Sequence, residues 1–443
     1  MRLKNIHRLP DLIRLFRALP NSGHIFLRRE FDRYHRHLSN LARAYRRIML
    51  RRTRIVAVVG SLGKTTTRRT ISAVLNCPER HFSYSNYGSS LAANILRVHR
   101  NDQYAVIEAG VSGPGQMESY AKMLRPDIVV VTSIKSEHNR SFPTLHDTRA
   151  EKVKMVRSLS NRGIAVLNGD DPNVRWMATQ TNAQVITVGL NADNDIRAEQ
   201  IKSYANRTTF TAILPNGSFQ IETRFLGLHM VYPFLAALAV ANIEHVNLEL
   251  AVARLTEVVS AESRMEMLRL PGDITVLDDS FKGTIESAHT AFDVLASIPA
   301  SRKIVVFGGV EEPPSKQGDL NRQIGRRLGE IADEVICLGT GMSGIRSGAV
   351  EAGLSRESVQ LIRPDFKAVV SMLKPKLREG DVVLIKGKST QRLRRVVLSL
   401  LGRQVSCVVP YCKVKVRSCD VCPLLDAPAQ LFHNHYISRY VRA

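Results

Sequence analysis

Short apolar runs alternate with helical patterns over most of the chain, and this alternation is the clearest structural signal in the sequence. The runs lie at Ile55–Val59, Ala105–Glu108, Ile128–Val131 and Ile164–Leu167, and then at Ile304–Phe307, Glu334–Leu338 and Val382–Ile385. Strands that alternate with helices predict mostly parallel sheets covered on both faces. We therefore expect an α/β protein with a large central domain and a smaller, Rossmann-like C-terminal α/β domain.

Apolar residues before the first strand recur every three or four positions, as on one face of an amphipathic helix of about five turns. The stripe consists of Phe31, Tyr34, Leu38, Leu41, Tyr45 and Ile48. A shorter pattern begins at Leu12 and ends at Pro20, a residue that stops helices. The predicted division is a basic helical segment (1–52), a central domain (53–268), a C-terminal domain (269–402) and a Cys-rich tail (403–443), with the main join near 264–275.

Composition narrows the class of protein. Apolar residues make up 44% of the 443 positions and charged residues 23%, as in soluble globular proteins. No apolar run approaches the roughly 20 residues that a membrane-spanning helix needs. Because the six cysteines suit a reducing compartment, we expect a cytoplasmic protein.

The net charge of +23 is concentrated near the N-terminus. Residues 1–54 hold fifteen Arg or Lys against three acidic residues, a surplus of twelve positive charges. Two interpretations stay open for residues 1–52: peripheral contact with an anionic membrane at its inner face, or docking of the apolar stripe on the central domain. Nucleic-acid binding is disfavoured because no nucleic-acid fold is recognised.

The segment Gly60–Thr67, GSLGKTTT, follows a predicted strand and precedes a predicted helix. Glycines allow backbone N–H groups to close around phosphate oxygens at a helix N-terminus. Lys64 would reach the β- and γ-phosphates, and the Thr65 hydroxyl would ligate Mg²⁺. The segment predicts ATP binding through Gly60, Ser61, Gly63, Lys64, Thr65 and Thr66.

Further motifs make residues 53–400 resemble the Mur ligases, with most similarity to the branch that adds D-alanyl-D-alanine to a muramoyl tripeptide. They are Tyr104–Met117 (YAVIEAGVSGPGQM), His138, Ala150–Lys152 (AEK), Val166–Pro172 (VLNGDDP), Ser263–Arg264 and Asp278–Ser280 (DDS). The resemblance implies an ATP-dependent ligase that joins a carboxylate to an amine through an acyl phosphate, in cell-wall or related peptide and polymer biosynthesis.

The same resemblance assigns roles to individual residues. Catalysis would fall to Lys64, Glu108, His138 and Lys152. Thr65 and Glu108 would hold one Mg²⁺, His138 a second, and Lys152 would carry a carbamate that supplies another oxygen ligand. Asn168, Arg264 and Asp279 would contact the nucleotide, and Lys386 the incoming substrate's carboxylate.

The sequence departs from that branch at three places. Met230 and Pro233 replace two asparagines, and Phe281–Ile285 replaces an Asn-rich element. Only about 52 residues precede the first strand, too few for the family's UDP-sugar domain. A polymer-directed ligase similar to poly-γ-glutamate or folylpolyglutamate synthetases is therefore an alternative, as is a non-catalytic ATP-binding protein of the same fold.

The tail contains a cysteine cluster. Cys407, Cys412, Cys419 and Cys422 could close a tetrahedral Zn²⁺ site, with His433 and His435 further on. An iron–sulfur cluster and reduced, unligated thiols are the alternatives.

Overall fold

The computed structural model of the chain describes residues 35–78, 88–136, 139–312, 317–412, 418–422 and 425–426. The chain forms two compact units. The first contains the described residues up to Ile201 together with Thr209–Thr223 and Met230–Val258. The second contains Lys202–Thr208, Arg224–His229 and the described residues from Val259 on.

The first unit is built on an eight-stranded sheet with the strand order β2-β1-β3-β4-β5-β6-β7-β8. The strands are β1 (Arg54–Val59), β2 (Tyr104–Glu108), β3 (Ile128–Val131), β4 (Ile164–Asn168), β5 (Gln184–Gly189), β6 (Ile196–Ser203), β7 (Thr208–Leu214) and β8 (Gly217–Thr223). The neighbouring pairs from β2 to β6 are parallel. The carboxyl ends of β1 to β4 therefore meet at one edge, where α/β proteins bind their ligands.

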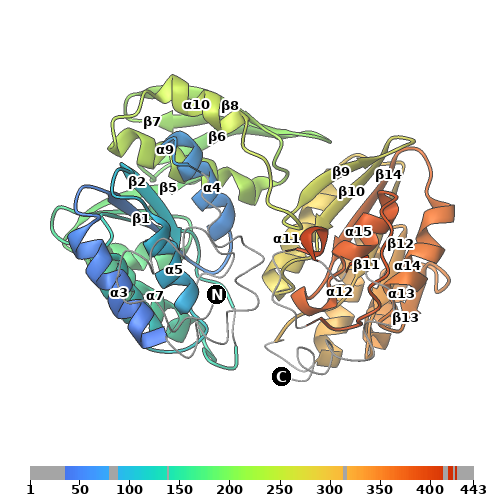
Figure 1. Cartoon of the computed structure of the whole chain (residues 1–443). Coiled ribbons are helices and arrows are strands. Elements are labelled where there is room, and N and C mark those ends of the chain that lie inside the picture. The colour runs from blue at the N-terminus through green and yellow to red at the C-terminus, as the bar shows by residue number, and fades with distance from the viewer. Residues whose placement is uncertain are drawn as a thin grey trace. The chain divides into compact units, whose positions relative to one another are not determined.

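Helices cover both faces of this sheet (Figure 1). One face carries α3 (His35–Ile48), α5 (Ser89–Arg97), α6 (Gln116–Leu124) and α7 (Leu145–Arg157) over a single apolar core. The other side has α4 (Lys64–Val74) packed against α9 (Val231–Ile243) and α10 (Leu248–Thr256). Shorter helical elements are α8 (Pro172–Arg175), η2 (Trp176–Gln180) and η3 (Leu228–Met230).

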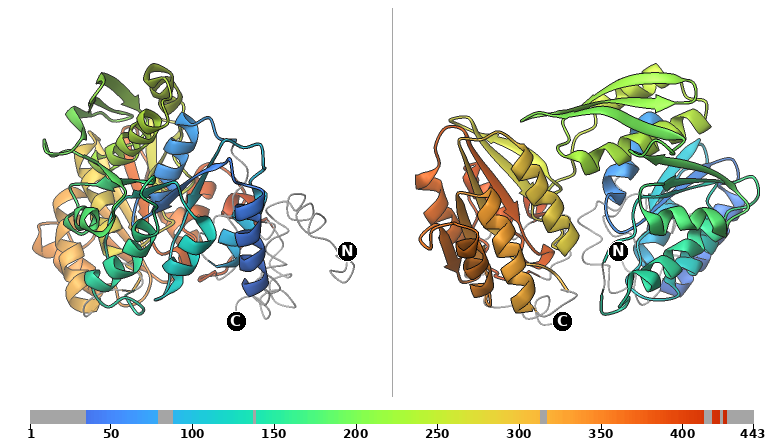
Figure 2. Two further views of the ribbon diagram at one scale, coloured as in Figure 1. Left: turned by 90° about the vertical axis from the view of Figure 1, so that its left-hand side faces the viewer. Right: turned by 180° about the vertical axis from the view of Figure 1, so that it is seen from behind.

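The apolar stripe of α3 docks on the first unit, beside α5 and α6 (Figure 2). Leu38 and Tyr45 are buried in the core of that face, and Tyr45 Oη donates a 2.8 Å hydrogen bond to the carbonyl oxygen of Val98. Ile48, predicted as part of the stripe, is the last residue of α3 and is instead 61% exposed. Phe31 and Tyr34 lie outside the described residues.

The second unit contains a six-stranded sheet with the order β13-β12-β11-β14-β10-β9. Its strands are β9 (Glu266–Leu270), β10 (Ile274–Asp279), β11 (Arg302–Phe307), β12 (Glu334–Leu338), β13 (Val359–Ile362) and β14 (Asp381–Lys386). All pairs are parallel except β9 with β10. Because β9 belongs to this sheet, the second unit takes in residues before the predicted boundary at 269.

Helices also flank the second sheet. They are α11 (Ile285–Ser297), α12 (Gln317–Ile331), α13 (Ser343–Glu351), α14 (Phe366–Leu373) and α15 (Arg394–Leu400), with short elements η4 (Lys374–Lys376), η5 (Ser389–Gln391) and η6 (Cys419–Val421). α12 and α13 pack closely because Gly348 has no side chain: a Cβ there would lie 2.0 Å from the carbonyl oxygen of Arg322. Within the described ranges, no helix combines the length and the apolar character required to cross a membrane.

The described part of the Cys-rich tail is anchored to the second unit. Cys419 and Leu425 pack against Leu398 of α15. Arg394 Nε donates to Asp420 at 2.9 Å, and Arg394 Nη1 pairs with Asp278 at 2.8 Å. A buried arginine thus joins the tail to the carboxyl end of β10.

Candidate active site

The loop between β1 and α4 has the backbone shape of a phosphate-binding turn. Gly60 has a φ of +140° and Gly63 a φ of +80°, conformations that favour glycine. A Cβ on Gly60 would lie 2.0 Å from Oγ1 of Thr132. No side chain caps α4 at Gly63, so the first N–H groups of the helix face the loop. Such a turn suits anionic phosphate oxygens.

Lys64 is held over this loop. Its Nζ donates to the carbonyl oxygens of Gly60 at 2.7 Å and of Ser61 at 3.0 Å, and the side chain is buried. The predicted phosphate-binding lysine thus lies with its charge at the turn, where it can stabilise negative charge that develops on a γ-phosphoryl group.

The segment after β3 supports the loop from the neighbouring strand. Ser61 donates its N–H to the carbonyl oxygen of Ser133 at 2.7 Å, and Thr132 Oγ1 donates to the carbonyl oxygen of Leu62 at 2.6 Å. The Ser61 hydroxyl and the backbone of Lys135 exchange two hydrogen bonds of 3.0 Å. The loop is therefore fixed by side chains and backbone together.

Asn168 and Asp171, at the end of β4, buttress that segment in turn. Asn168 Nδ2 donates to the carbonyl oxygen of Thr132 at 2.8 Å, and Asp171 Oδ2 accepts the N–H of Ile134 at 2.9 Å. Asn168, predicted to contact the nucleotide, is buried and positions the backbone behind the phosphate loop.

Thr65 in the first turn of α4 and Glu108 at the end of β2 form an oxygen pair. β1 pairs with β2 so that Val58 is opposite Glu108, and Thr65 Oγ1 donates to Glu108 Oε2 at 2.9 Å. Hydroxyl and carboxylate oxygens are the hard donors that Mg²⁺ prefers. The two residues therefore fit a magnesium ion. His138, the third predicted ligand, lies outside the described residues.

Lys152 lies against the phosphate loop from α7. Its side chain is only 1% exposed, and Nζ donates to Ser61 Oγ at 3.1 Å. The preceding residue, Glu151, is also buried, and its carboxylate accepts the N–H groups of Gly115 at 3.0 Å and Met117 at 2.7 Å. One turn of α7 thus fixes both the lysine and the loop that follows Glu108.

Sequence analysis did not identify Glu151 or Asp170 as site-building residues. Asp170 Oδ2 accepts the hydroxyl of Tyr232 at 2.9 Å, and burial, reinforced by this hydrogen bond, raises the pKa of Tyr232. The carboxylate also accepts Nδ2 of Asn194 at 2.8 Å. Both acids lie inside motifs that resemble those of the Mur ligases, Ala150–Lys152 and Val166–Pro172. The sequence therefore indicated the two segments, but it did not reveal which groups the carboxylates would bind.

Arg264 and Asp279, the other predicted nucleotide contacts, lie in the second unit. The Arg264 guanidinium stacks over Phe281 at 4.3 Å from the ring centroid, and Asp279 forms an ion pair of 2.8 Å with Lys386 Nζ. Lys386 is fully buried and also donates to Ser287 Oγ and to the carbonyl oxygen of Lys282. The expectation that Lys386 contacts a substrate carboxylate is therefore wrong for this structure, because protein oxygens surround its ammonium group.

His229 of η3 faces Lys386 and Asp293 in the same unit. Burial lowers the pKa of His229 to about 4, with a further lowering by Lys386 that the Asp293 carboxylate opposes. The imidazole is consequently neutral at physiological pH.

The predicted zinc site is not supported. All four tail cysteines are described, and none of them is joined in a disulfide; across the described ranges no three His, Cys, Asp or Glu side chains are grouped closely enough to hold a metal ion. Burial raises the pKa of the Cys419 thiol to about 12, and the thiol is therefore protonated near neutral pH. His433 and His435 lie outside the described residues.

Comparison with known proteins places this geometry in a family. The family profile described as the Mur ligase middle domain matches residues 58–241, and the profile described as the Mur ligase glutamate ligase domain matches residues 263–389. The UDP-N-acetylmuramoyl-tripeptide–D-alanyl-D-alanine ligase of Bacillus subtilis is 25% identical over 378 residues, 83% of this chain and 80% of that protein. The Escherichia coli enzyme of the same name is 26% identical, covering 78% of this chain and 76% of its own.

Solved structures share the fold. A MurF structure from Acinetobacter baumannii superposes with a TM-score of 0.75 at 21% identity, covering 83% of this chain and 81% of that one. The MurF ligase of Thermotoga maritima in complex with ADP gives a TM-score of 0.71 at 21% identity and covers 83% of both chains.

Proposed function

This chain belongs to the Mur ligase family and is an ATP-dependent amide ligase, and we propose that it lengthens a cell-wall-type peptide by activating its carboxyl group as an acyl phosphate. The observation that carries the proposal is the position of Lys152, buried against Ser61 of the phosphate loop. The Thr65–Glu108 oxygen pair borders the same loop. A phosphate loop bordered by oxygen ligands suited to Mg²⁺ is the arrangement used in phosphoryl transfer, and this supports the proposal.

In the first step a carboxylate oxygen attacks the γ-phosphorus of ATP, and the bond to the bridging oxygen breaks to release ADP. Two anions must approach each other, so positive charge around the γ-phosphoryl group lowers the barrier. Lys64 supplies that charge from the loop. Gly60, Ser61, Gly63 and Thr66 line the turn that orients the phosphates.

The amine then attacks the carbonyl carbon of the acyl phosphate, phosphate leaves and the amine loses a proton. Bound Mg²⁺ supplies charge neutralisation to the phosphate oxygens in both steps. We assign Thr65 and Glu108 to one ion and His138 to a second. Lys152, as a carbamate, would offer a further anionic oxygen. Asn168 maintains the loop, and Arg264 and Asp279 remain assigned to the nucleotide, as the resemblance implies.

The names of the relatives support a proposal for the substrate class. The Bacillus and Escherichia enzymes are ligases of a muramoyl tripeptide and D-alanyl-D-alanine. We propose a muramoyl-type peptide as the carboxylate donor and a dipeptide or amino acid as the amine. Met230 and Pro233 are buried here, and the Pro233 carbonyl oxygen accepts the Thr70 hydroxyl at 2.9 Å. The nucleotide base must therefore be bound without the two asparagines that these residues replace.

Incubation of the protein with ATP, Mg²⁺ and paired pools of carboxylates and amines tests the proposal. The pools should include a muramoyl tripeptide with D-alanyl-D-alanine, and poly-γ-glutamate or folate with glutamate. Mass spectrometry of new amides, together with stoichiometric ADP and phosphate, is the readout. Amide formed only in the glutamate pools would favour the polymer-directed alternative, and ATP binding without any product would favour a non-catalytic protein.

A further inference from the structure

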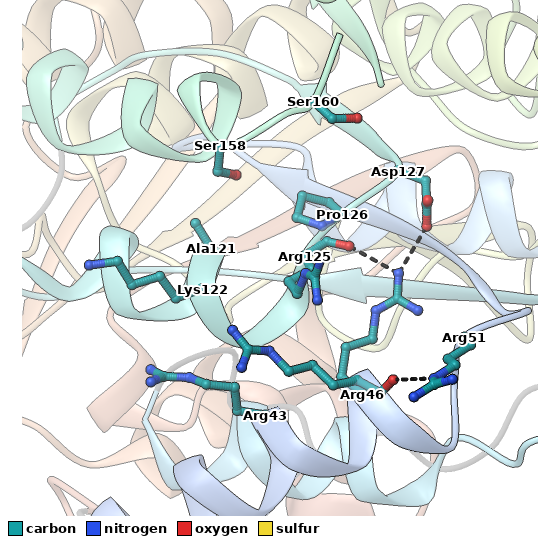
Figure 3. Close-up of a pocket in the computed structure, with 11 residues that line it drawn as sticks. Arg43, Arg46, Arg51, Ala121, Lys122, Arg125, Pro126, Asp127, Ser158 and Ser160 are labelled. Atoms are coloured by element: carbon teal, nitrogen blue, oxygen red, sulfur yellow. Dashed lines mark hydrogen bonds and ion pairs between the residues drawn. The ribbon is translucent and has the colours of Figure 1, made fainter. Parts of the chain in front are cut away.

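A cavity of about 700 Å³ opens between α3 and α6 in the first unit, and its lining is dominated by cations (Figure 3). We call it the α3–α6 pocket; its basic lining residues are Arg43, Arg46, Arg47, Arg51, Lys122 and Arg125. Among the lining residues that the structure describes, Asp127 is the one acidic side chain.

The pocket lies away from the phosphate loop. Arg125 and Asp127 immediately precede β3, so the pocket is at the amino-terminal edge of the parallel strands, whereas the phosphate loop follows their carboxyl ends. A ligand here would not take part in phosphoryl transfer.

Arg46 is a structural residue of this pocket. It is buried and donates to the carbonyl oxygens of Leu124 at 2.9 Å and Arg125 at 3.0 Å, and to Asp127 Oδ2 at 3.1 Å. Asp127 Oδ2 also accepts the N–H of Ile55 at 2.8 Å. The Asp127 carboxylate thus already accepts hydrogen bonds from Arg46 and from the backbone of Ile55.

Three other guanidinium groups have no such role. In the described part of the chain, no hydrogen bond or ion pair engages the side chains of Arg43, Arg47 or Arg125. The Nε of Arg43 is buried without an acceptor, which is unfavourable unless a ligand provides one.

The walls of the pocket suit a phosphate group. Ser158 and Ser160 line the side opposite α3 (Figure 3). The Ser158 hydroxyl donates to the carbonyl oxygen of Met155 at 2.7 Å, so Ser160 is the hydroxyl donor on that side. Guanidinium groups bind phosphate oxygens through paired N–H donors. Beside the pocket, at the end of α3, Ile48 is 61% exposed and Met49 41% exposed. Exposed apolar residues next to a basic site are typical of surfaces that meet anionic lipids.

We propose that the α3–α6 pocket binds a phosphate group, with Arg43, Arg47 and Arg125 as its ligands. Two sources share this chemistry: the headgroup of an anionic phospholipid and a soluble phosphate ester. The site is independent of the proposed ligase reaction and does not rest on it.

The test uses the full-length protein with excess ADP and Mg²⁺, which fill the phosphate loop. One arm measures cosedimentation with phosphatidylcholine vesicles that contain or lack phosphatidylglycerol. The other measures heats of titration with glycerol phosphate. The double variant Arg43→Gln/Arg125→Gln is compared with Arg356→Gln/Arg363→Gln, which removes the same charge from exposed positions of the second unit.

The pocket variant should bind vesicles about thirty-fold more weakly than wild type. Each basic residue near an anionic surface contributes about 1 kcal/mol to the binding free energy, and the variant loses two of them. The control variant should bind like wild type, and both should retain solution turnover. Loss in both arms identifies a lipid headgroup, and loss with glycerol phosphate alone identifies a soluble ester. Equal binding by pocket variant and wild type, or no binding by wild type to either probe, overturns the proposal. If the double variant does not fold, exposed Arg47→Gln is compared with Arg356→Gln in the same assays.

Discussion

Nζ of Lys152 donates a 3.1 Å hydrogen bond to Oγ of Ser61, so a helix of the first unit is tied directly to the phosphate loop. Ser61 in turn is bonded to the segment after β3 through Ser133 and Lys135. The Lys152 side chain is fully buried, whereas lysine side chains are almost always exposed to solvent in proteins. Its burial beside the phosphate loop argues for a role in the reaction.

Substitution Lys152→Ala should lower turnover by about two to three orders of magnitude, because it removes an electrostatic group from the site. If the lysine carries a carbamate, acetate or formate should restore part of the activity. Wild type exposed to ¹³C-labelled CO₂ should show a carbamate carbon by NMR that Lys152→Ala lacks. Lys154→Ala is the matched control, since Lys154 pairs with Glu151 on the same helix at 2.6 Å. Full activity of Lys152→Ala would leave the lysine with a packing role only.

Lys64→Ala should reduce substrate-dependent ADP formation by about a thousand-fold, since one preorganised charge at the γ-phosphoryl group is lost. The melting temperature of the variant should be measured alongside, because the loss of hydrogen bonds to the carbonyl oxygens of Gly60 and Ser61 lowers stability without itself removing ADP formation. Lys202→Ala removes an exposed lysine and serves as the control. ADP release at the wild-type rate in Lys64→Ala would contradict the assignment of the phosphate loop.

Glu108→Gln and Thr65→Val should each raise the Mg²⁺ concentration needed for half-maximal activity, by about ten- to a hundred-fold. Each removes an oxygen ligand from the pair that lies 2.9 Å apart. Thr65→Ser keeps the hydroxyl and should behave almost like wild type. The measurement is turnover against free Mg²⁺ at saturating ATP, and an unchanged Mg²⁺ requirement in both variants would argue against this metal site.

Sequence patterns predicted those parts of the fold and site that depend on neighbours along the chain. The buried strands β1 to β4 are nearly continuous apolar runs, so they could be predicted from the sequence, and the structure confirms them. β6 (Ile196–Ser203) has only two buried positions and carries several polar residues, so it does not form an apolar run that the sequence pattern could reveal. Thr65 and Glu108 follow or end neighbouring strands, and parallel pairing brings such positions together.

Features that depend on distant packing could not be predicted. Lys386 ends a strand, as a ligand-binding residue could, but the carboxylate of Asp279, more than a hundred residues earlier, encloses its ammonium group. The cysteine spacing fitted a zinc site, whereas the described residues form no such group. In both cases the residue types suited the predicted chemistry, but the folded arrangement of residues distant in the sequence did not produce the predicted site.

The lowered pKa of His229 makes the stability of the second unit depend on pH. Its pKa is about 4 in the folded chain, because burial disfavours the charged form, and about 6.5 when unfolded. The unfolded chain thus binds the proton more readily. The stabilisation is fully present above about pH 6.5 and is lost as the pH falls toward 4. At pH 5 the wild type should have lost about 1–2 kcal/mol of its free energy of unfolding through this group, relative to pH 7.

His229→Gln should lack this component, so the stability difference between wild type and variant should shrink as the pH is lowered. Denaturant unfolding of both proteins at pH 7 and pH 5 measures it, with exposed His146→Gln as the control. Parallel loss of stability in wild type and His229→Gln would show that the imidazole takes up its proton without cost in the folded state.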